Sequence, residues 1–101
     1  MIIDEVRRAA GCRVLFLPHA VRQMSRPDRM ISADEVSEVV RTGVVLEDYP
    51  DDPRGHSCLV AAQSSEGRMV HVVCAPKADF LAVITAYVPD PEQWVDGTRR
   101  R

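Results

Sequence analysis

The sequence predicts an α+β protein in which a mostly antiparallel sheet of four to five strands carries helices on one face. Three observations lead to this fold class. Apolar residues recur at helical spacing in three segments before residue 43, whereas the later segments run or alternate as strands do. These strands follow one another without helices between them, which favours antiparallel pairing. The 101 residues, 46% hydrophobic and 28% charged, suit a single globular domain with one core.

A helix over residues 2–10 and a strand over residues 13–17 are expected first. In the helix the apolar residues lie three or four positions apart, and Gly11 stands where a helix would end. The following run, RVLFL, is short and rich in β-forming residues, so it is predicted to be the first strand.

The next segment, PHAVRQMSR at residues 18–26, is predicted to be a second helix. Pro18 can open it, and Pro27 ends it because proline cannot continue a helix. Its buried stripe would consist of Ala20, Val21 and Met24. The side chains left facing solvent or a cleft would be His19, Arg22, Gln23 and Arg26. This helix therefore offers either a basic ligand-binding ridge or an ordinary solvated face.

The third predicted helix begins with a capping box. Ser32 and Glu35 have the S-x-x-E spacing in which each side chain caps the other residue's backbone N–H. Ile31 and Val36 are spaced to pack together across this cap. Gly43 follows the last apolar residues and is expected to end the helix in the left-handed conformation that glycine favours.

Four consecutive strands are expected after this helix. They are VVLEDY at 44–49, SCLVAAQ at 57–63, RMVHVVCA at 68–75 and FLAVITAYV at 80–88. The connection PDDPRGH is a polar loop, and SSEG suits a hairpin. A single domain is thus predicted for residues 1–101, with an N-terminal helix at 1–11, a core at 12–89 and a C-terminal tail at 90–101.

Strand alternation predicts which side chains gather on the face that the helices leave uncovered. In RMVHVVCA, His71 shares a face with Val73. In FLAVITAYV, simple alternation places Thr85 and Tyr87 on the face of Val83. We therefore expect His71, Thr85 and Tyr87 to form a polar group on the uncovered face.

Charge is segregated along the chain, although the net charge is only −2. Residues 7–29 contain six arginines and one aspartate, whereas residues 34–52 contain seven acidic residues and one arginine. Such asymmetry suggests one face for an anionic ligand and another that repels it or binds a basic partner. Solvated faces would produce the same pattern, so both interpretations stay open.

Several kinds of site are not predicted. Cys12, Cys58 and Cys74 are odd in number and have no close pair, so we expect buried reduced thiols rather than disulfides or a zinc site. No glycine-rich phosphate loop, H-E-x-x-H, C-x-x-C or G-x-S-x-G motif occurs, and neither a metal nor another cofactor is expected. The longest apolar stretch is too short to span a membrane and no targeting pattern begins the chain, so we expect a cytoplasmic protein without a membrane partner.

The stretch HAVRQMSRPDRMISADEVSEVVRTGVVLEDYPDDPRGHSCLV, with MVHVVC and VITAYVP after it, resembles a bacterial family of small uncharacterised domains. In that family a His-Ala start and an arginine-rich helix lead to an Ile-Ser-capped helix that ends in glycine. A Tyr-Pro-x-Asp-x-Arg loop, a histidine-containing strand and a closing Ile-Thr-x-Tyr-x-Pro strand follow. The resemblance covers residues 19–89, and RPDRMIS stands where the family has Arg-Gly-Ile-Ser. The family is similar to RelE-like and MqsR-like toxins, which implies a RelE-like fold.

This resemblance implies a toxin-like endoribonuclease of a type II toxin–antitoxin pair that cleaves messenger RNA without a metal. The implied partners are RNA and a cognate antitoxin, such as a zinc-finger protein of the MqsA kind; the oligomeric state stays open. The catalytic positions that the resemblance carries over are His71, His19 and Tyr87. The RNA- or phosphate-binding positions are Arg22, Arg26 and Arg54, with Thr85 in a supporting role.

These residue types match what metal-free RNA cleavage needs. A base must take the 2′-hydroxyl proton, a cation must hold the phosphate charge, and an acid must protonate the leaving oxygen. Histidine, with an ordinary pKa of about 6.5, serves in either proton transfer near neutral pH. Arginine donates two parallel hydrogen bonds to phosphate, and tyrosine donates a hydrogen bond or stacks on a base.

Each candidate also has a purely structural interpretation. His19 could be a surface residue at a helix start, His71 a hydrogen-bonded core histidine, and Arg54 the partner of Asp51 or Asp52 in its own loop. The pI of about 5.9 favours an alternative function, because nucleic-acid affinity depends mainly on neutralising phosphates. That alternative is a non-catalytic interaction domain that keeps the RelE-like fold and binds a protein partner.

Overall fold

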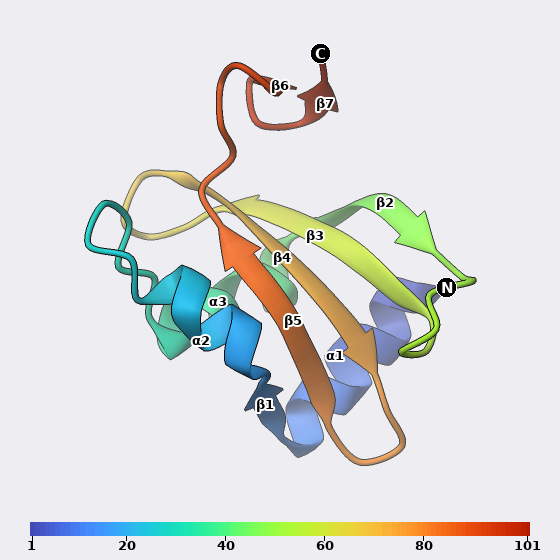
Figure 1. Ribbon diagram of the computed structural model, residues 1–101. Helices are drawn as coiled ribbons and strands as arrows, with labels where there is room; N and C mark the ends of the chain where they lie inside the picture. The colour runs from blue at the N-terminus through green and yellow to red at the C-terminus, as the bar shows by residue number, and fades with distance from the viewer.

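The computed structural model describes residues 1–101 and contains three helices, a five-stranded sheet and a small two-stranded ribbon (Figure 1). The helices are α1 (Ile2–Cys12), α2 (Pro18–Met24) and α3 (Ala33–Thr42). The sheet strands are β1 (Val14–Phe16), β2 (Val44–Tyr49), β3 (Ser57–Gln63), β4 (Met69–Pro76) and β5 (Leu81–Tyr87). The ribbon pairs β6 (Trp94–Val95) with β7 (Arg99–Arg100).

The sheet has the strand order β1-β5-β4-β3-β2, and each neighbouring pair except β1–β5 is antiparallel. The predicted α+β class with a mostly antiparallel sheet is therefore confirmed. The short β1 forms one edge of the sheet and β2 forms the other, so β4 and β5 lie well inside it.

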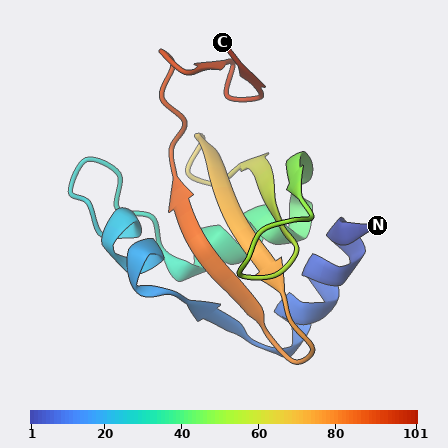
Figure 2. The ribbon, with the colours of Figure 1, turned by 45° about the vertical axis from the view of Figure 1, so that its right-hand side comes forward.

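The helices and the sheet enclose a single large core. Helices α1 and α3 lie behind the strands in Figure 1, α1 stands to the right of the strands in Figure 2, and α2 lies alongside β5. Apolar side chains from all three helices share one buried cluster with residues of β3, β4 and β5. Its fully enclosed members include Val6, Val36, Val60, Val72 and Val83. None of the helices combines the length and apolarity that crossing a membrane requires.

Two helices end at other residues than predicted. α1 continues through Gly11 to Cys12, because a glycine inside a helix costs only about 0.5–1 kcal/mol relative to alanine. Cys12 is exposed, which corrects the expectation of three buried thiols, whereas the other two cysteines are buried as expected. α2 ends at Met24, and Val21, expected in its buried stripe, is 49% exposed. The contact of α2 with β5 needs only the narrow stripe of Ala20 and Met24.

α3 begins after Ser32 as predicted, but with only half of the capping box. The Ser32 Oγ accepts a hydrogen bond from the Glu35 backbone N–H at 3.1 Å. The Glu35 carboxylate does not return to the cap and instead accepts from Arg68 at 2.7 Å. A long-range ion pair to the β3–β4 connection therefore replaces the second local bond.

Gly43 ends α3 for a different reason from the predicted one. Its φ of −82° and ψ of 177° are extended rather than left-handed. A Cβ at this position would lie 2.6 Å from the Val39 carbonyl oxygen and 2.7 Å from that of Ala61. The glycine is thus needed for the close approach of α3 to β3, not for a positive φ.

A bulge in β5 reverses the predicted alternation of that strand. The pairing with β4 skips Ile84, so the residues on its two sides do not alternate as in a regular strand. Val83 packs in the core under the helices, whereas Thr85 and Tyr87 face the other side, where Tyr87 pairs with His71. The expectation that Thr85 and Tyr87 share a face with Val83 is wrong for this reason. Their expected gathering with His71 nevertheless holds, and the bulge makes it possible.

Candidate functional site

His71 in β4 and Tyr87 in β5 meet on the face of the sheet that carries no helix. His71 has no exposed surface; its Nε2 lies 2.6 Å from the Gly97 carbonyl oxygen and its Nδ1 lies 3.3 Å from the Tyr87 hydroxyl. Since a carbonyl only accepts, Nε2 carries the hydrogen, and Nδ1 accepts from Tyr87. Burial is the largest influence on the pKa of His71 and lowers it, so the imidazole is neutral at neutral pH.

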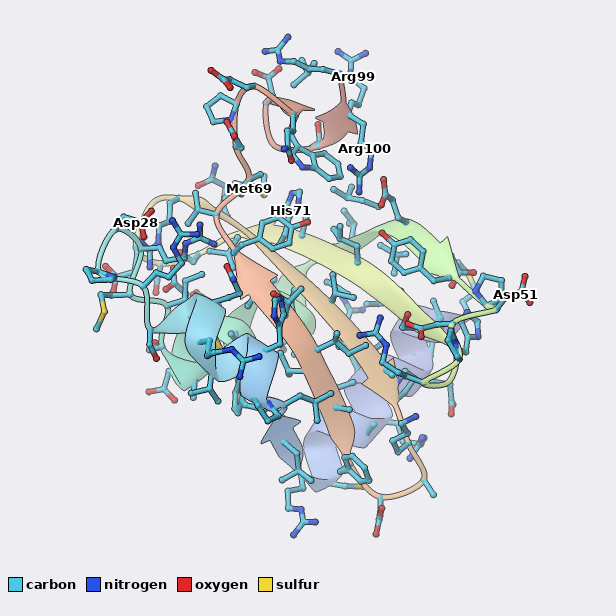
Figure 3. All side chains as sticks on the ribbon, in the orientation of Figure 1. Asp28, Asp51, Met69, His71, Arg99 and Arg100 are labelled. Carbon is cyan, nitrogen blue, oxygen red and sulfur yellow. The ribbon has the colours of Figure 1, made fainter.

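Residues 90–101, expected to be a tail, fold over this end of the sheet, and we call them the C-terminal clasp (Figure 3). The Trp94 ring meets His71 edge-on, with ring centroids 4.6 Å apart. The Arg100 guanidinium lies 4.6 Å over the Trp94 ring and donates to the Glu47 carboxylate at 2.6 and 3.1 Å. The clasp is thereby tied to β2, and it covers part of the face that the sequence predicted to be open.

The ion pair between Arg100 and Glu47, which attaches the clasp to β2, stays charged at neutral pH. Arg100, the largest influence, lowers the pKa of Glu47, so that carboxylate stays ionised near neutral pH. The Tyr49 hydroxyl donates to the same carboxylate. Burial, together with this contact, raises the pKa of Tyr49 to about 12, so its hydroxyl keeps its proton.

A polar groove of about 360 Å³ opens beside this cluster, between α2, the end of β5 and the start of the clasp. Among the residues that line it are His19, Gln23, Arg29, Thr85, Tyr87 and Asp90. The groove unites His19, Thr85 and Tyr87, which the sequence named as site residues. Tyr87 connects the two parts of the site, because it lines the groove while its hydroxyl bonds to the buried His71. Burial raises the pKa of Tyr87, so the hydroxyl keeps its proton at neutral pH.

Arg54 does not join this group. Its guanidinium donates twice to the Asp52 carboxylate, at 3.0 and 3.1 Å, which is the pairing that the sequence left open. Its carbonyl oxygen accepts from Lys77, which directly follows β4. His71 stands near the other end of β4, so Arg54 and His71 lie at opposite ends of the sheet.

Arg22 and Arg26, expected one turn apart on the same helix, do not form the basic ridge that the sequence suggested. α2 ends at Met24, so Arg26 lies beyond the helix, where it pairs with Asp28 at 3.3 Å on the exposed surface. Arg22 is exposed on α2, and its side chain makes no hydrogen bond or ion pair. The groove instead receives the neighbouring helix positions, His19 and Gln23.

Arg29 is the residue of the groove that the sequence did not single out. It lies in the loop between α2 and α3, and its side chain is only 14% exposed. The basic run RPDR was visible in the sequence, but nothing local distinguished this arginine from Arg22 or Arg26. Its burial depends on the path of the loop, which contacts with the distant β3–β4 connection fix.

Comparison with known proteins points to one family. The model of a domain of unknown function, DUF4258, matches residues 16–88, whereas no curated protein and no solved structure matches the chain. The matched segment contains α2, α3 and strands β2 to β5, and it leaves out α1 and the clasp. The expectation of an uncharacterised domain family is confirmed. Because the match covers well over half of its length, the chain belongs to this family, DUF4258.

Proposed function

We propose that the protein is a toxin-like, RelE-like endoribonuclease that cleaves RNA without a metal in the groove between α2 and β5. The observation that carries the proposal is the meeting of His19 and Tyr87 in one polar groove, from two elements far apart in sequence. An imidazole and a phenol at the same groove supply the two proton transfers of the reaction. The family resemblance noted in the sequence supports the same assignment.

The proposed reaction uses His19 as the base and Tyr87 as the acid. His19 takes the proton of an RNA 2′-hydroxyl, and the 2′-oxygen attacks the adjacent phosphorus. The bond from phosphorus to the 5′-oxygen breaks, and that oxygen receives the Tyr87 proton as the hydroxyl rotates its O–H from the His71 Nδ1 toward the groove. The products are a 2′,3′-cyclic phosphate and a 5′-hydroxyl, and solvent then returns the proton from His19 to Tyr87. The raised pKa of Tyr87 keeps its proton in place until the leaving oxygen develops charge.

His71 has a positioning role in this proposal instead of the catalytic role that the resemblance implied. It is fully buried, so RNA in the groove does not touch it in this conformation. Its Nδ1 accepts from Tyr87 and its Nε2 is held by Gly97, so the imidazole orients the phenol from behind. Thr85 lies beside Tyr87 in the groove and can donate a hydrogen bond to the substrate.

The test is cleavage of an end-labelled single-stranded RNA by the purified protein in a chelator. We expect the wild type to leave 2′,3′-cyclic phosphate ends, and His19→Ala and Tyr87→Phe each to slow cleavage about 100-fold or more, as loss of a general acid or base does. Arg54→Ala, at the far end of the sheet, is the matched control and should keep full activity. RNA left intact from pH 5 to 9, or equal cleavage by the wild type and both groove variants, would refute the proposal.

The enclosure of His71 favours a second candidate, a non-catalytic domain that binds a protein partner. In this alternative the clasp and His71 are structural, and the acidic segment 34–52 contacts a basic partner such as an antitoxin. The two candidates differ in cells. Expression of the endoribonuclease should arrest growth, and His19→Ala should relieve the arrest, whereas the interaction domain should cause no arrest that depends on His19.

A further inference from the structure

Arg29 contains a buried polar atom that lacks a partner. Its Nε is enclosed, yet it makes no hydrogen bond, and it is the only such side-chain nitrogen or oxygen in the molecule. Buried polar groups in proteins are nearly always hydrogen-bonded, so this exception needs an explanation. The nearest carboxylate, that of Asp28, lies 3.9 Å away, beyond hydrogen-bond distance.

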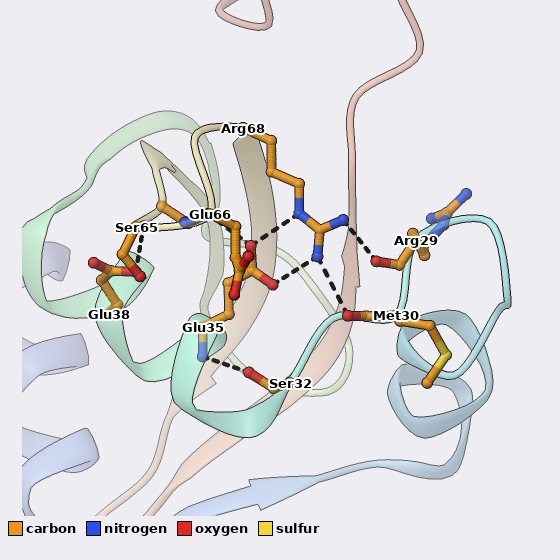
Figure 4. A network of polar contacts seen from close by, with 9 residues as sticks. Arg29, Met30, Ser32, Glu35, Glu38, Ser65, Glu66 and Arg68 are labelled. Atoms are coloured by element: carbon orange, nitrogen blue, oxygen red, sulfur yellow. Dashed lines mark hydrogen bonds and ion pairs between the residues drawn. The ribbon is translucent and has the colours of Figure 1, made fainter.

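The backbone at Arg29 is held in place by the side chain of Arg68, which comes from the β3–β4 connection (Figure 4). Arg68 donates to the Arg29 carbonyl oxygen at 2.6 Å and to that of Met30 at 3.3 Å. The same guanidinium pairs with the buried Glu35 carboxylate at 2.7 and 3.0 Å. One ion pair therefore fixes two consecutive carbonyls, and with them the base of the Arg29 side chain.

The backbone conformation of Met30 is a second indication that this loop has a functional role. Its φ is +45°, in the left-handed region that residues other than glycine rarely occupy. The side chain of Met30 is itself exposed, so packing does not explain the strain. Strained backbone that its surroundings hold in place concentrates at functional sites. Here the strained residue immediately follows Arg29.

The surroundings of Arg29 leave it free to bind an anion. It lines the groove of His19 and Tyr87 and also an adjoining groove that contains Arg26, Asp28 and Asp90. Both aspartates already have partners: Asp28 pairs with Arg26 at 3.3 Å, and Asp90 accepts from the Glu92 backbone at 2.9 Å. Arg29 is thus a cation of this region whose side chain donates no hydrogen bond and makes one long ion pair, to Asp28 at 3.9 Å.

We propose that Arg29 is the phosphate-binding residue of the groove and that its ligand is a phosphodiester. A guanidinium offers Nε and a terminal nitrogen as parallel donors to two phosphate oxygens. The identification of that phosphodiester as RNA backbone rests on the proposed function. The phosphate site itself rests only on the position, the confinement and the unpartnered Nε of Arg29.

The test follows the arginine Nε–Hε signals, and the backbone amide signals of the groove residues, by ¹H–¹⁵N NMR during titration with inorganic phosphate. We expect one signal to shift saturably as the anion draws the guanidinium toward the groove. The shift should vanish in Arg29→Gln and persist in Arg22→Gln, a matched exposed arginine on α2. Arg29→Lys keeps the charge but loses the paired donors, and it should weaken binding at least tenfold. Absence of a saturable shift in the wild type, or its persistence in Arg29→Gln, would overturn the site.

A second arm separates this site from the proposed cleavage. A 2′-deoxy dinucleoside monophosphate cannot be cleaved by 2′-oxygen attack, so its binding reports the phosphodiester alone. Saturable binding that requires Arg29, in a protein that never cleaves RNA, would retain the phosphodiester site and remove the proposed function. Binding of inorganic phosphate without the dinucleotide would exclude the phosphodiester as the ligand. RNA cleavage that Arg29→Gln leaves unchanged would assign phosphate binding to another residue.

Discussion

Replacing Arg68 with alanine should destabilise the protein strongly. Arg68 is the ionic partner of Glu35, whose side chain is only 4% exposed. Without it the carboxylate keeps one side-chain partner, the Ser64 hydroxyl at 2.6 Å. The carbonyls of Arg29 and Met30 also lose their donor. The change therefore leaves a buried charge without its counterion and releases the loop that positions Arg29.

The magnitude follows from the burial of the two partners. Removing one member of a buried ion pair costs about 3–5 kcal/mol, because the other charge stays desolvated. Arg68 is 30% exposed, so water replaces part of the lost contact, and we expect a loss of about 3 kcal/mol in the free energy of unfolding at neutral pH. For a domain whose total stability is about 5–15 kcal/mol, this loss is large.

Urea denaturation followed by the fluorescence of Trp94, the single tryptophan, measures this loss. The double variant Glu35→Gln/Arg68→Ala is the control; it removes the stranded charge and should recover part of the stability. The pH dependence gives an independent check. Arg68, as the largest influence, lowers the pKa of Glu35. The pair therefore stabilises the fold above the ordinary carboxyl pKa of about 4.3, and this contribution is lost as the pH falls through the lowered value.

Two results would refute the reasoning. A loss below about 1 kcal/mol in Arg68→Ala would mean that the pair behaves as a surface ion pair. A double variant no more stable than the single one would mean that the stranded carboxylate is not the cause.

Three further predictions concern the clasp and the strained loop. Because the pKa of His71 is lowered in the fold, its contribution to the free energy of unfolding should be fully present above about pH 6.5 and be lost as the pH falls through the lowered value. Urea denaturation of His71→Gln should lack this pH dependence, and an unchanged dependence would contradict the reasoning. Gly97→Ala places a Cβ 2.7 Å from the Met69 Cγ at a φ of +71°, so it should cost about 1–2 kcal/mol and shift Trp94 emission to the red; unchanged emission would show that the clasp stays closed. Met30→Gly should raise stability by up to about 1 kcal/mol, because relief of the left-handed strain exceeds the entropy cost of glycine; a lower melting temperature would show that the φ of +45° is not strained.

The elements that the sequence predicted well have local determinants. β2 and β3 have the predicted bounds, because each is a run of β-forming residues with a polar turn after it. α3 begins after Ser32, because that hydroxyl caps the backbone of a residue three positions away. Patterns of this kind need no knowledge of the tertiary contacts.

The features that escaped prediction depend on distant segments. The bulge at Ile84 follows from the register between two strands, and the role of Gly43 follows from the approach of β3. The clasp forms because Trp94 and Gly97 reach His71 across more than 20 residues, which no local pattern encodes. Polar tail residues therefore resembled a loop in the sequence.

The candidate site likewise contains residues that the sequence alone could identify and one that depends on tertiary contacts. Residue types that suit RNA chemistry could be named from the sequence, and His19, Thr85 and Tyr87 do share a groove. The phosphate-binding residue could not be named. Arg22, Arg26 and Arg29 differ only in how α2 ends and where Arg68 holds the next loop, and both depend on the folded chain.

The central claim is that RNA binds in the groove between α2 and β5, and one NMR titration tests it most directly. The ligand is a short single-stranded RNA with 2′-O-methyl groups at every position, so that it binds without being cleaved, and the readout is the backbone amide signals of the full chain. We predict saturable shifts at His19, Arg29, Tyr87 and neighbouring groove residues. The signals of the acidic segment 34–52, which includes β2, should not shift. Shifts confined to residues 34–52, or no saturable shift in the groove, would contradict the account.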